Sequence, residues 1–493
     1  MNGFTRKNLY HAAGMAAETK ISQSSFVPAI YTHIETDSRQ VDDKCVFFAL
    51  PGIASNGWDY LDDVAALGCT IAVVPAHLAL QEKGIELIRV EDPASLMITC
   101  LQRFFGSLPA KALAVTGTNG KSSICFYIAQ LANSLGFHAG LVGTFGVGGL
   151  DALQEAKQTT PDLLSMHRLL MDMRKTGVDL VAFEASSHAL DQGRIEGVPF
   201  QTAVFSNLSR DHLDYHGDMA HYAEAKQRLF AFDSVDQAVF CLDDDYCEFM
   251  ASAASQKTRY YYSEQNVRAD FFTKQLAFEP TGCRFVLCHP EGESEVFLPL
   301  LGRFNIQNAL AALASLWPDA SDKRMLIKGL STLKGAPGRM EKIHRENAPL
   351  VVVDYAHTPD ALQVALQALK EHSKRRLICV FGCGGDRDRG KRPLMMSVAL
   401  EHADYVWLTS DNPRTEAVEQ IFSDTLSQVQ EGASFSFETD RHHAISQAIL
   451  SASPDDMILI AGKGHETYQD INGTKYHFDD REVALAAMET YVN

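Results

Sequence analysis

The sequence predicts an α/β protein of three domains in which parallel sheets alternate with helices. Two observations predict this fold class: short apolar runs typical of buried strands recur along the chain, and polar or glycine-rich motifs directly follow several of them. A length of 493 residues allows two to four domains at roughly 100–200 residues each. We expect domains over residues 1–92, 93–335 and 336–493.

The first range reads as a small α/β domain. Its apolar runs, Cys45–Leu50, Thr70–Val74 and Ile85–Val90, have the length of short strands. Turn signals such as Pro51-Gly52 and Asn56-Gly57 separate them.

The second range has a strand–helix–strand pattern. A short strand at Lys111–Val115 precedes a glycine-rich turn and a helical segment, Ser122–Leu135, which Gly136 is expected to end. Further strands are expected near Leu180–Phe183 and Ala203–Phe205. Such alternation predicts a mostly parallel sheet.

The third range begins at a linker-like segment, Gly335-Ala336-Pro337-Gly338. Four buried strands are expected after it, and each leads into a polar motif. Because ligands bind beyond the carboxyl ends of parallel strands, these motifs predict one binding edge. The strands are Leu350–Asp354, Leu377–Phe381, Tyr405–Thr409 and Met457–Ala461, and the motifs are Tyr355–Thr358, Gly382–Arg389, Ser410–Glu416 and Gly462–Glu466.

The composition argues against several classes of protein. Asp and Glu total 62 against 44 Lys and Arg, a net charge of −18, so the basic face that nucleic-acid binding needs is not expected. No stretch offers about 18 consecutive apolar residues, so we expect no membrane insertion. Ten cysteines without a C-x-x-C pair favour free thiols in a reducing cytoplasm.

The loop Thr116-Gly117-Thr118-Asn119-Gly120-Lys121-Ser122 is the sharpest motif. Between a strand and a helix, its backbone amides can hold phosphate oxygens, Lys121 can reach the β- and γ-phosphates, and the Ser122 hydroxyl can bind Mg²⁺. Val115 stands where the Walker A pattern has its first glycine. The alternative is a plain strand-to-helix turn.

Two acidic or histidine-bearing motifs follow strands in the same range. Glu184, at the end of Leu180–Phe183, is well placed to hold Mg²⁺, although a capping acid is the safer interpretation of this residue alone. Asp211–His216 contains two Asp and two His, which predict either a metal site or a polar loop. Lys226, in a helical segment, reads on chemistry alone as a surface lysine.

In the third range, two arginines follow neighbouring strands. Arg387 and Arg414 can each bind a carboxylate with two hydrogen bonds, and Glu466 can bind an ammonium group. Together they predict a site for an amino acid, although each motif alone could be a structural turn.

These motifs, in this order, resemble those of the Mur ligases of peptidoglycan synthesis over nearly the whole chain. The resemblance rests on Thr116–Ser122, Thr159-Thr160-Pro161-Asp162, Glu184–His188, Asn207–His216, Asp354–His357, Gly382–Arg389, Asp411–Arg414 and Gly462–Glu466. It implies a UDP-sugar-binding first domain, a P-loop ATPase-type central domain and a Rossmann-like third domain.

The resemblance also implies roles by position. Lys121, Glu184, His212 and Lys226 would serve catalysis. Two Mg²⁺ ions are implied: Ser122, Glu184 and His212 would be Mg²⁺ ligands, and Lys226, carbamylated, would help to hold the second ion. ATP would meet the Thr116–Ser122 loop and Asn305, Arg339, Asp354 and His357, whereas the UDP-sugar dipeptide would meet Ser38, Thr159, Thr160, Ser186, Gln192 and Arg194.

The choice of amino acid is the finest implication. In this family Asp-Asn-Pro-Arg accompanies diaminopimelate, and here it stands as Asp411-Asn412-Pro413-Arg414, with Arg387, Gly462 and Glu466 beside it. The expected activity is ATP-dependent addition of meso-2,6-diaminopimelate to the D-glutamyl residue of UDP-N-acetylmuramoyl-L-alanyl-D-glutamate through an acyl phosphate, by a cytoplasmic monomer. A folylpolyglutamate synthetase, a lysine-adding ligase and a nucleotide-binding switch are the alternatives.

Overall fold

The computed structural model describes residues 3–15, 30–52, 55–82, 84–155 and 159–492. The chain divides into two compact units, residues 1–113 with 138–201 and residues 114–137 with 202–493. Across the described ranges, no helix combines the length and the apolar character needed to span a bilayer.

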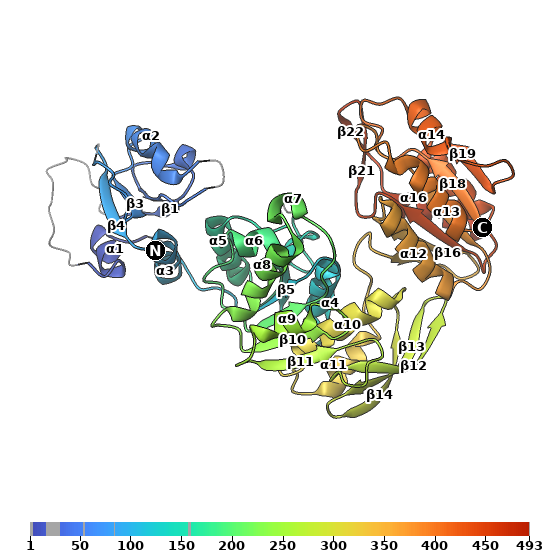
Figure 1. The fold of residues 1–493 in the computed structure, drawn as a ribbon, viewed down its shortest axis with the longest axis horizontal. Helices are drawn as coiled ribbons and strands as arrows, with labels where there is room; N and C mark the ends of the chain where they lie inside the picture. Colours follow the sequence, from blue (N-terminus) through green and yellow to red (C-terminus); the bar gives the residue numbers. More distant parts are fainter. Residues whose placement is uncertain (1–2, 16–29, 53–54, 83, 156–158, 493) are drawn as a thin grey trace. The chain divides into compact units, whose positions relative to one another are not determined.

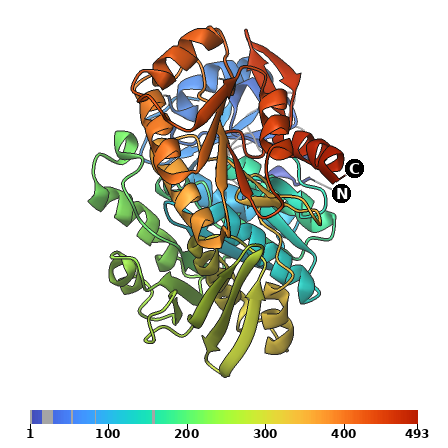
Figure 2. The same ribbon diagram turned by 90° about the vertical axis from the view of Figure 1, so that its right-hand side faces the viewer.

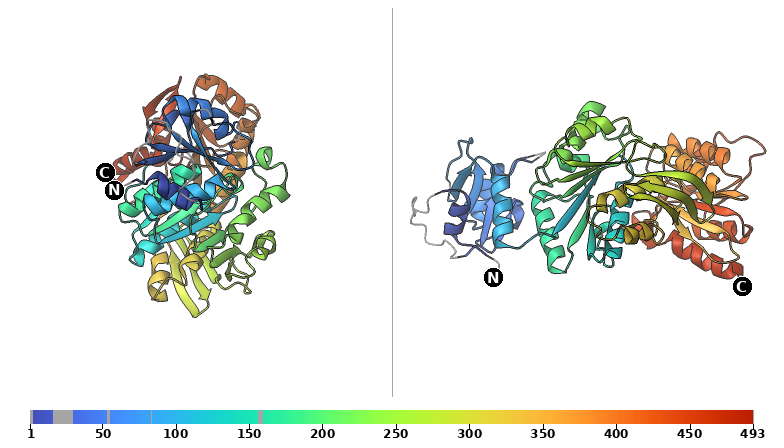
Figure 3. Two further views of the ribbon diagram at one scale, coloured as in Figure 1. Left: turned by 90° about the vertical axis from the view of Figure 1, so that its left-hand side faces the viewer. Right: turned by 90° about the horizontal axis from the view of Figure 1, so that it is seen from below.

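The first sheet is four-stranded and parallel (Figures 1 and 3). One face packs on helices α1 and α3, and the other packs on α2. Three of its strands coincide with the predicted apolar runs to within two residues at either end. The elements are α1 (Arg6–Ala12), β1 (His33–Glu35), η1 (Ser38–Gln40), β2 (Cys45–Phe48), η2 (Gly57–Tyr60), α2 (Leu61–Ala66), β3 (Ile71–Pro75), β4 (Glu86–Val90) and α3 (Pro93–Phe104).

The second sheet has seven strands in the order β11-β10-β9-β5-β8-β6-β7. The β6–β7 pair is antiparallel, and the β6–β8, β9–β10 and β10–β11 pairs are parallel. The predicted helix at 122–135 is α4, and Gly136 follows it at φ 90°. The elements are β5 (Lys111–Thr116), α4 (Lys121–Ser134), β6 (Ala139–Gly143), β7 (Gly146–Gly149), α5 (Leu163–Lys175), β8 (Leu180–Glu184), α6 (Ser187–Asp191), β9 (Thr202–Phe205), α7 (Leu213–His216), α8 (Met219–Ala231), β10 (Gln237–Cys241), α9 (Cys247–Ser252), β11 (Thr258–Tyr262), α10 (Arg303–Leu316) and α11 (Lys323–Leu330).

A third, antiparallel sheet was not predicted from the sequence. It consists of β12 (Phe272–Glu279), β13 (Gly282–His289) and β14 (Gly292–Leu298). His372 ties it to the following region: its Nε2 accepts a hydrogen bond from the Gly302 amide at 2.9 Å, and its Nδ1 donates to the Glu279 carbonyl at 2.6 Å.

The last large sheet has six strands in the order β15-β16-β20-β17-β18-β19, all parallel except β15. Helices α12, α13 and α14 cover one face, and α15 and α16 cover the other (Figure 2). The bounds of β16, β17, β18 and β20 match the four predicted strands. The elements are β15 (Glu341–Ile343), β16 (Leu350–Asp354), α12 (Pro359–His372), β17 (Leu377–Phe381), α13 (Lys391–His402), β18 (Tyr405–Thr409), α14 (Val418–Leu426), β19 (Phe435–Glu438), α15 (Arg441–Leu450), β20 (Met457–Ala461), β21 (Tyr468–Ile471), β22 (Thr474–His477) and α16 (Asp480–Val492).

Candidate active site

The loop after β5 is held in a tight conformation. Gly117 has φ 147°, and a Cβ there would lie 1.9 Å from the Ser206 hydroxyl oxygen. The Thr118 amide donates to the Asn207 carbonyl at 2.8 Å, and Ser206 Oγ donates to the Asn119 carbonyl at 2.6 Å. These contacts fix the loop backbone against the chain that follows β9, and they already use the Thr118 amide and, through Asn207 Oδ1, the Asn119 amide.

Two lysines meet at this loop. Lys121 Nζ donates to the carbonyls of Gly117 and Thr118 at 2.9 and 2.8 Å, and Lys226 Nζ donates to the Gly117 carbonyl at 2.7 Å. Lys226 is only 1% exposed, so the interpretation of it as a surface lysine is wrong. Burial, and then the charge of Lys121, hold the pKa of Lys226 well below its usual value, while Asp211 opposes this. Such a pair of cations favours a bound anion, or conversion of Lys226 to an anion.

His212 lies beside this pair. Its backbone is left-handed (φ 53°), and its Nε2 lies 3.5 Å from Asp211 Oδ2. The His212 ring centroid is 6.2 Å from that of Tyr222, and Lys226 Nζ lies 4.5 Å from the same Tyr222 centroid. The Asp211–His212 motif and Lys226 therefore share one neighbourhood.

Glu184 is buried at the end of β8, and its carboxylate accepts hydrogen bonds from Thr144. The Thr144 amide and hydroxyl donate to its carboxylate at 2.7 and 3.3 Å. Thr160, next to Thr159, donates from Oγ1 to the Glu184 carbonyl at 3.1 Å and lies 3.2 Å from Ser186 Oγ. Of the predicted dipeptide contacts, Thr160, Ser186, Gln192 and Arg194 are brought together, because Arg194 donates to Gln192 Oε1 at 2.7 Å and to the Thr160 carbonyl at 3.2 Å.

The predicted Mg²⁺ ligands fit a hard cation in part. The Ser122 hydroxyl and the Glu184 carboxylate supply oxygen, which Mg²⁺ prefers, and His212 supplies nitrogen. The Lys226 amine donates a hydrogen bond to the Gly117 carbonyl, and in its protonated form it would repel a cation. As a carbamate it would instead offer two oxygens and a negative charge, which are the ligand type that Mg²⁺ prefers.

The nucleotide contacts predicted in the third range lie at the end of β16. The carboxylate of Asp354 accepts the amides of Met340 and Ala356, both at 2.8 Å, and burial raises its pKa. The Arg339 guanidinium lies 4.8 Å from the centroid of the Tyr355 ring, and the exposed His357 has its Nδ1 2.8 Å from the Tyr355 carbonyl. Arg339, Asp354 and His357 therefore gather around Tyr355.

Two other predicted ligand contacts, Asn305 and Ser38, are not among the residues gathered around Tyr355. Asn305 is 2% exposed, accepts the Tyr127 hydroxyl at 2.9 Å and donates to the Leu301 carbonyl at 2.9 Å, so its amide already bonds within the protein. Ser38 is half-buried in η1, behind Asp37, which caps that turn. The Arg39 guanidinium holds the pKa of Asp37 at about 2.

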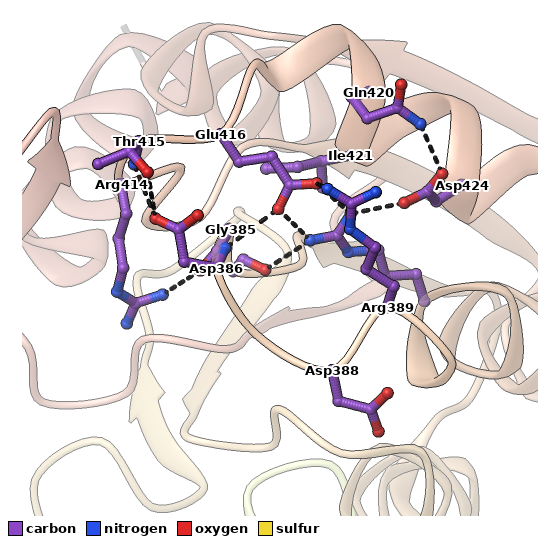
Figure 4. A network of polar contacts seen from close by, with 12 residues as sticks. Gly385, Asp386, Asp388, Arg389, Arg414, Thr415, Glu416, Gln420, Ile421 and Asp424 are labelled. Atoms are coloured by element: carbon purple, nitrogen blue, oxygen red, sulfur yellow. Dashed lines mark hydrogen bonds and ion pairs between the residues drawn. The ribbon is translucent and has the colours of Figure 1, made fainter.

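The two arginines of the third range do converge. A Cβ on Gly384 would lie 3.0 Å from Arg414 Nη1 and 3.7 Å from Arg387 Cγ, so both side chains flank this glycine. Arg414 Nη1 also donates to the Gly385 carbonyl at 2.8 Å (Figure 4). The Arg414 guanidinium and the aliphatic part of the Arg387 side chain therefore both lie beside Gly384.

Lys463, which was not predicted, lies between the other residues of this edge. It is fully buried, and its Nζ donates to Asn412 Oδ1 at 3.0 Å and lies 3.3 Å from Glu466 Oε2. Asn412 Nδ2 donates to the same Glu466 oxygen at 3.0 Å. Gly462 approaches Asp411 so closely that a Cβ would lie 2.6 Å from Asp411 Oδ2. These contacts join the Asp411–Arg414 and Gly462–Glu466 motifs.

The hairpin β21–β22 holds Arg414 from behind. The Arg414 amide donates to the Asp470 carbonyl at 3.0 Å, and the Asn472 amide donates to the Arg414 carbonyl at 2.8 Å. Sequence reasoning missed this hairpin, although Asn472-Gly473 is a strong two-residue hairpin signal.

Comparisons with known proteins show the family to which this chain is related. Two family models match, Mur ligase middle domain over residues 115–316 and Mur ligase, glutamate ligase domain over 338–464. The UDP-N-acetylmuramoyl-L-alanyl-D-glutamate–2,6-diaminopimelate ligase of Pseudomonas syringae pv. tomato is 43% identical over 460 residues, which cover 92% of this chain and 94% of that protein. A solved structure of a ligase with the same name has a TM-score of 0.78 at 37% identity and covers all of both chains.

A more distant structural similarity concerns the alternative function of a folylpolyglutamate synthetase. The Mycobacterium tuberculosis folylpolyglutamate synthase complexed with ADP has a TM-score of 0.56 at 19% identity, covering 71% of this chain and 87% of that one. At this identity the likeness shows the fold alone.

Proposed function

Because this chain belongs to the Mur ligase family, we propose that it uses ATP to join meso-2,6-diaminopimelate to the D-glutamyl residue of UDP-N-acetylmuramoyl-L-alanyl-D-glutamate. Relatives that share more than 40% of its sequence over nearly its whole length carry the name of this ligase.

One observation carries the choice of amino acid: Arg387 and Arg414 flank Gly384 together. Diaminopimelate has a carboxylate at each end, and lysine has only one. The Arg414 guanidinium lies beside Gly384, and the Arg387 side chain starts from the same place, so both could turn toward one planar carboxylate and each donate two hydrogen bonds to it. The pair would be left without a ligand anion if lysine were bound, which disfavours the lysine-adding alternative.

We propose the following steps. The γ-carboxylate of the D-glutamyl residue attacks the γ-phosphorus of ATP, the bond to the β,γ-bridging oxygen breaks, and ADP leaves. The amine of diaminopimelate then attacks the acyl phosphate carbon, phosphate leaves, and the amine loses a proton. Lys121 would stabilise the negative charge on the phosphates, and the loop backbone would position them.

For the metal, we propose two Mg²⁺ ions, with Ser122, Glu184 and His212 as ligands and carbamylated Lys226 helping to hold the second ion. When bound, Mg²⁺ supplies positive charge beside the phosphate oxygens. Lys226 supports this assignment because a buried amine with a lowered pKa is more often neutral, and the neutral amine is the form that reacts with carbon dioxide.

The remaining assignments are proposals that follow the resemblance. ATP binds Thr116–Ser122 and residues of the third domain. The UDP-sugar dipeptide binds the first domain and the group formed by Thr160, Ser186, Gln192 and Arg194. The chain acts as a monomer of three domains, 1–92, 93–335 and 336–493, in the cytoplasm, and its ten buried free cysteines suit a reducing compartment. The proposed contacts are Thr116, Gly117, Thr118, Asn119, Gly120, Lys121, Ser122, Asn305, Arg339, Asp354 and His357 for ATP, and Ser38, Thr159, Thr160, Ser186, Gln192 and Arg194 for the dipeptide.

The test is phosphate release from ATP with the UDP-sugar dipeptide and either meso-diaminopimelate or L-lysine, with product mass determined for each. We expect turnover with diaminopimelate, and a rise in its KM of roughly 10- to 100-fold in Arg414→Ala. Turnover with lysine would contradict the choice of amino acid. Ligation of glutamate to folate would favour the folylpolyglutamate synthetase, and ATP hydrolysis that ignores every amino acid would favour the switch.

A further inference from the structure

Glu416 lies two residues after Arg414, and several donors converge on its carboxylate (Figure 4). Arg392 Nη1 and Nη2 donate to its two oxygens at 2.8 and 2.6 Å, and Arg389 Nη2 lies 2.9 Å from Oε1. The Asp386 amide donates to Oε2 at 3.0 Å. The Arg392 hydrogen bonds hold the pKa of Glu416 at about 2, so it is ionised wherever the protein is folded near neutral pH.

Arg392 stands behind this carboxylate on α13, and its side chain is fully buried. It donates to Asp424 Oδ2 on α14 at 2.7 Å and to the Gly384 carbonyl at 3.3 Å. A buried guanidinium needs acceptors for its donors, so Arg392 holds Glu416 and the Gly384 backbone in fixed places.

The same glutamate thereby connects the two loops that carry the arginines. Glu416 belongs to the segment after β18, and Asp386 belongs to the loop after β17. Asp386 Oδ2 in turn accepts the amide and hydroxyl of Thr415 at 2.9 and 2.8 Å, and the Gly385 amide donates to the Asn412 carbonyl at 2.9 Å. The two loops are therefore joined in both directions.

The backbone at both arginine-bearing loops is strained. Asp386 and Arg414 both have φ 52°, in the left-handed region that residues with a side chain adopt only where their surroundings hold them. The Glu416–Asp386 and Asp386–Thr415 hydrogen bonds supply such a hold for Asp386, and the hairpin supplies one for Arg414.

These contacts also engage the two acidic side chains near Arg414, those of Asp386 and Glu416, in hydrogen bonds with other residues. Asp386 bonds to Thr415, and Glu416 bonds to Arg392 and Arg389. Within the ranges that the structure describes, Arg414 has no acidic group at ion-pair distance, and its Nη1 donates to a backbone carbonyl. Its guanidinium thus keeps its positive charge for a ligand.

We propose that Glu416, with Arg392 behind it, is a positioning residue that joins the 384–387 loop to the 412–416 segment and so sets the spacing of the Arg387 and Arg414 guanidinium groups for the carboxylate of the amino-acid substrate. This inference rests on the proposed function for the identity of that substrate. Glu416 itself does not touch the reacting atoms.

The test compares Glu416→Gln with a matched control, Asp424→Asn. Both changes remove one carboxylate from Arg392, but Asp424 lies on α14 and has no contact of this kind with the 384–387 loop. In Glu416→Gln one acceptor oxygen becomes a donor that faces Arg392 or the Asp386 amide. We expect KM for diaminopimelate to rise roughly 10-fold or more, with KM for ATP within about twofold of the unaltered protein. Asp424→Asn is expected to keep KM for diaminopimelate within about twofold.

A second measurement needs no substrate. Amide hydrogen exchange of residues 384–387 in the full-length protein is expected to be faster in Glu416→Gln than in Asp424→Asn, because only the first change weakens the group that accepts the Asp386 amide: glutamine keeps one acceptor oxygen, which Arg392 and the Asp386 amide must then share. Equal exchange in the two variants, or equal KM values for diaminopimelate, would overturn the proposal. If the unaltered protein does not ligate diaminopimelate, the proposed function fails, and the exchange measurement still decides whether Glu416 joins the loops.

Discussion

Lys121 and Lys226 donate hydrogen bonds to one and the same acceptor, the carbonyl oxygen of Gly117, at 2.9 and 2.7 Å. One of the two begins α4 and the other lies in the middle of α8. Two ammonium groups this close repel each other, and the lowered pKa of Lys226 records part of that repulsion. A carbamate on Lys226 would turn the repulsion into attraction.

Replacement of Lys226 by arginine is therefore expected to lower turnover by on the order of 100-fold. Arginine keeps the positive charge but stays protonated, so it cannot form the carbamate. The measurement is phosphate release under saturating substrates, together with a carbon-13 spectrum in labelled bicarbonate. The carbamate signal should be present in the unaltered protein and missing in Lys226→Arg. Full turnover in the arginine variant would contradict the assignment of Lys226 as a metal ligand.

The same burial predicts a pH dependence of stability. A lysine whose pKa is lowered on folding binds fewer protons in the folded state than in the unfolded state, so stability falls as the pH falls from about 10.5 towards the pKa of the folded protein. Lys226→Met removes this penalty. We expect it to raise the free energy of unfolding by roughly 1–3 kcal/mol at pH 7 in buffer freed of carbon dioxide, with turnover lost. Urea unfolding at pH 7 and pH 9 measures the difference in the free energy of unfolding between Lys226→Met and the unaltered protein. A difference that is as large at pH 9 as at pH 7 would contradict the lowered pKa of Lys226.

Two neighbouring glycines allow a test of the arginine site. A Cβ on Gly385 would lie 1.9 Å from the Pro413 carbonyl oxygen, which is backbone, whereas a Cβ on Gly384 would meet the movable Arg414 guanidinium at 3.0 Å. We expect Gly385→Ala to lower stability by roughly 1–3 kcal/mol and to raise KM for diaminopimelate. Gly384→Ala should raise that KM with little loss of stability. Urea unfolding and steady-state kinetics distinguish the two, and identical behaviour of both variants would refute the geometry.

The buried pair of Arg441 and Asp480 is expected to stabilise the same edge. Arg441 donates to both Asp480 oxygens at 2.7 Å, and also to the carbonyls of Ser410 and Ala461 at the ends of β18 and β20. Asp480→Asn leaves a buried guanidinium without its counter-charge, so we expect a loss of about 3 kcal/mol or more in urea unfolding. The control is Glu482→Gln, an exposed acid paired with His477, which should change stability by less than about 1 kcal/mol.

The predictability of the fold from sequence followed the burial of its strands. Strands β16, β17, β18 and β20 are continuous apolar runs, because helices cover both faces of their sheet, and their predicted bounds match the structure. The sheet β12–β14 escaped prediction because many of its residues face solvent and charged side chains interrupt its apolar pattern.

The predictability of the site had a different limit. The burial of Lys226 could have been predicted from helical spacing, since it shares one face of α8 with Tyr222 and Leu229, both buried. The contacts of Lys463 and Glu416 could not have been predicted from the sequence. Lys463 bonds to Asn412 and Glu416 bonds to Arg392, and only tertiary structure brings these segments together.

The backbone bridge between Arg414 and Ile471 has a consequence for protein engineering. The residue that is proposed to choose the amino acid takes its left-handed conformation from a hairpin more than fifty positions further along the chain. If Arg414 chooses the amino acid as proposed, a transfer of selectivity to another protein needs both segments, residues 411–416 and residues 468–477. A graft of the first segment alone would lack the hairpin contacts that hold the backbone of Arg414 in its left-handed conformation.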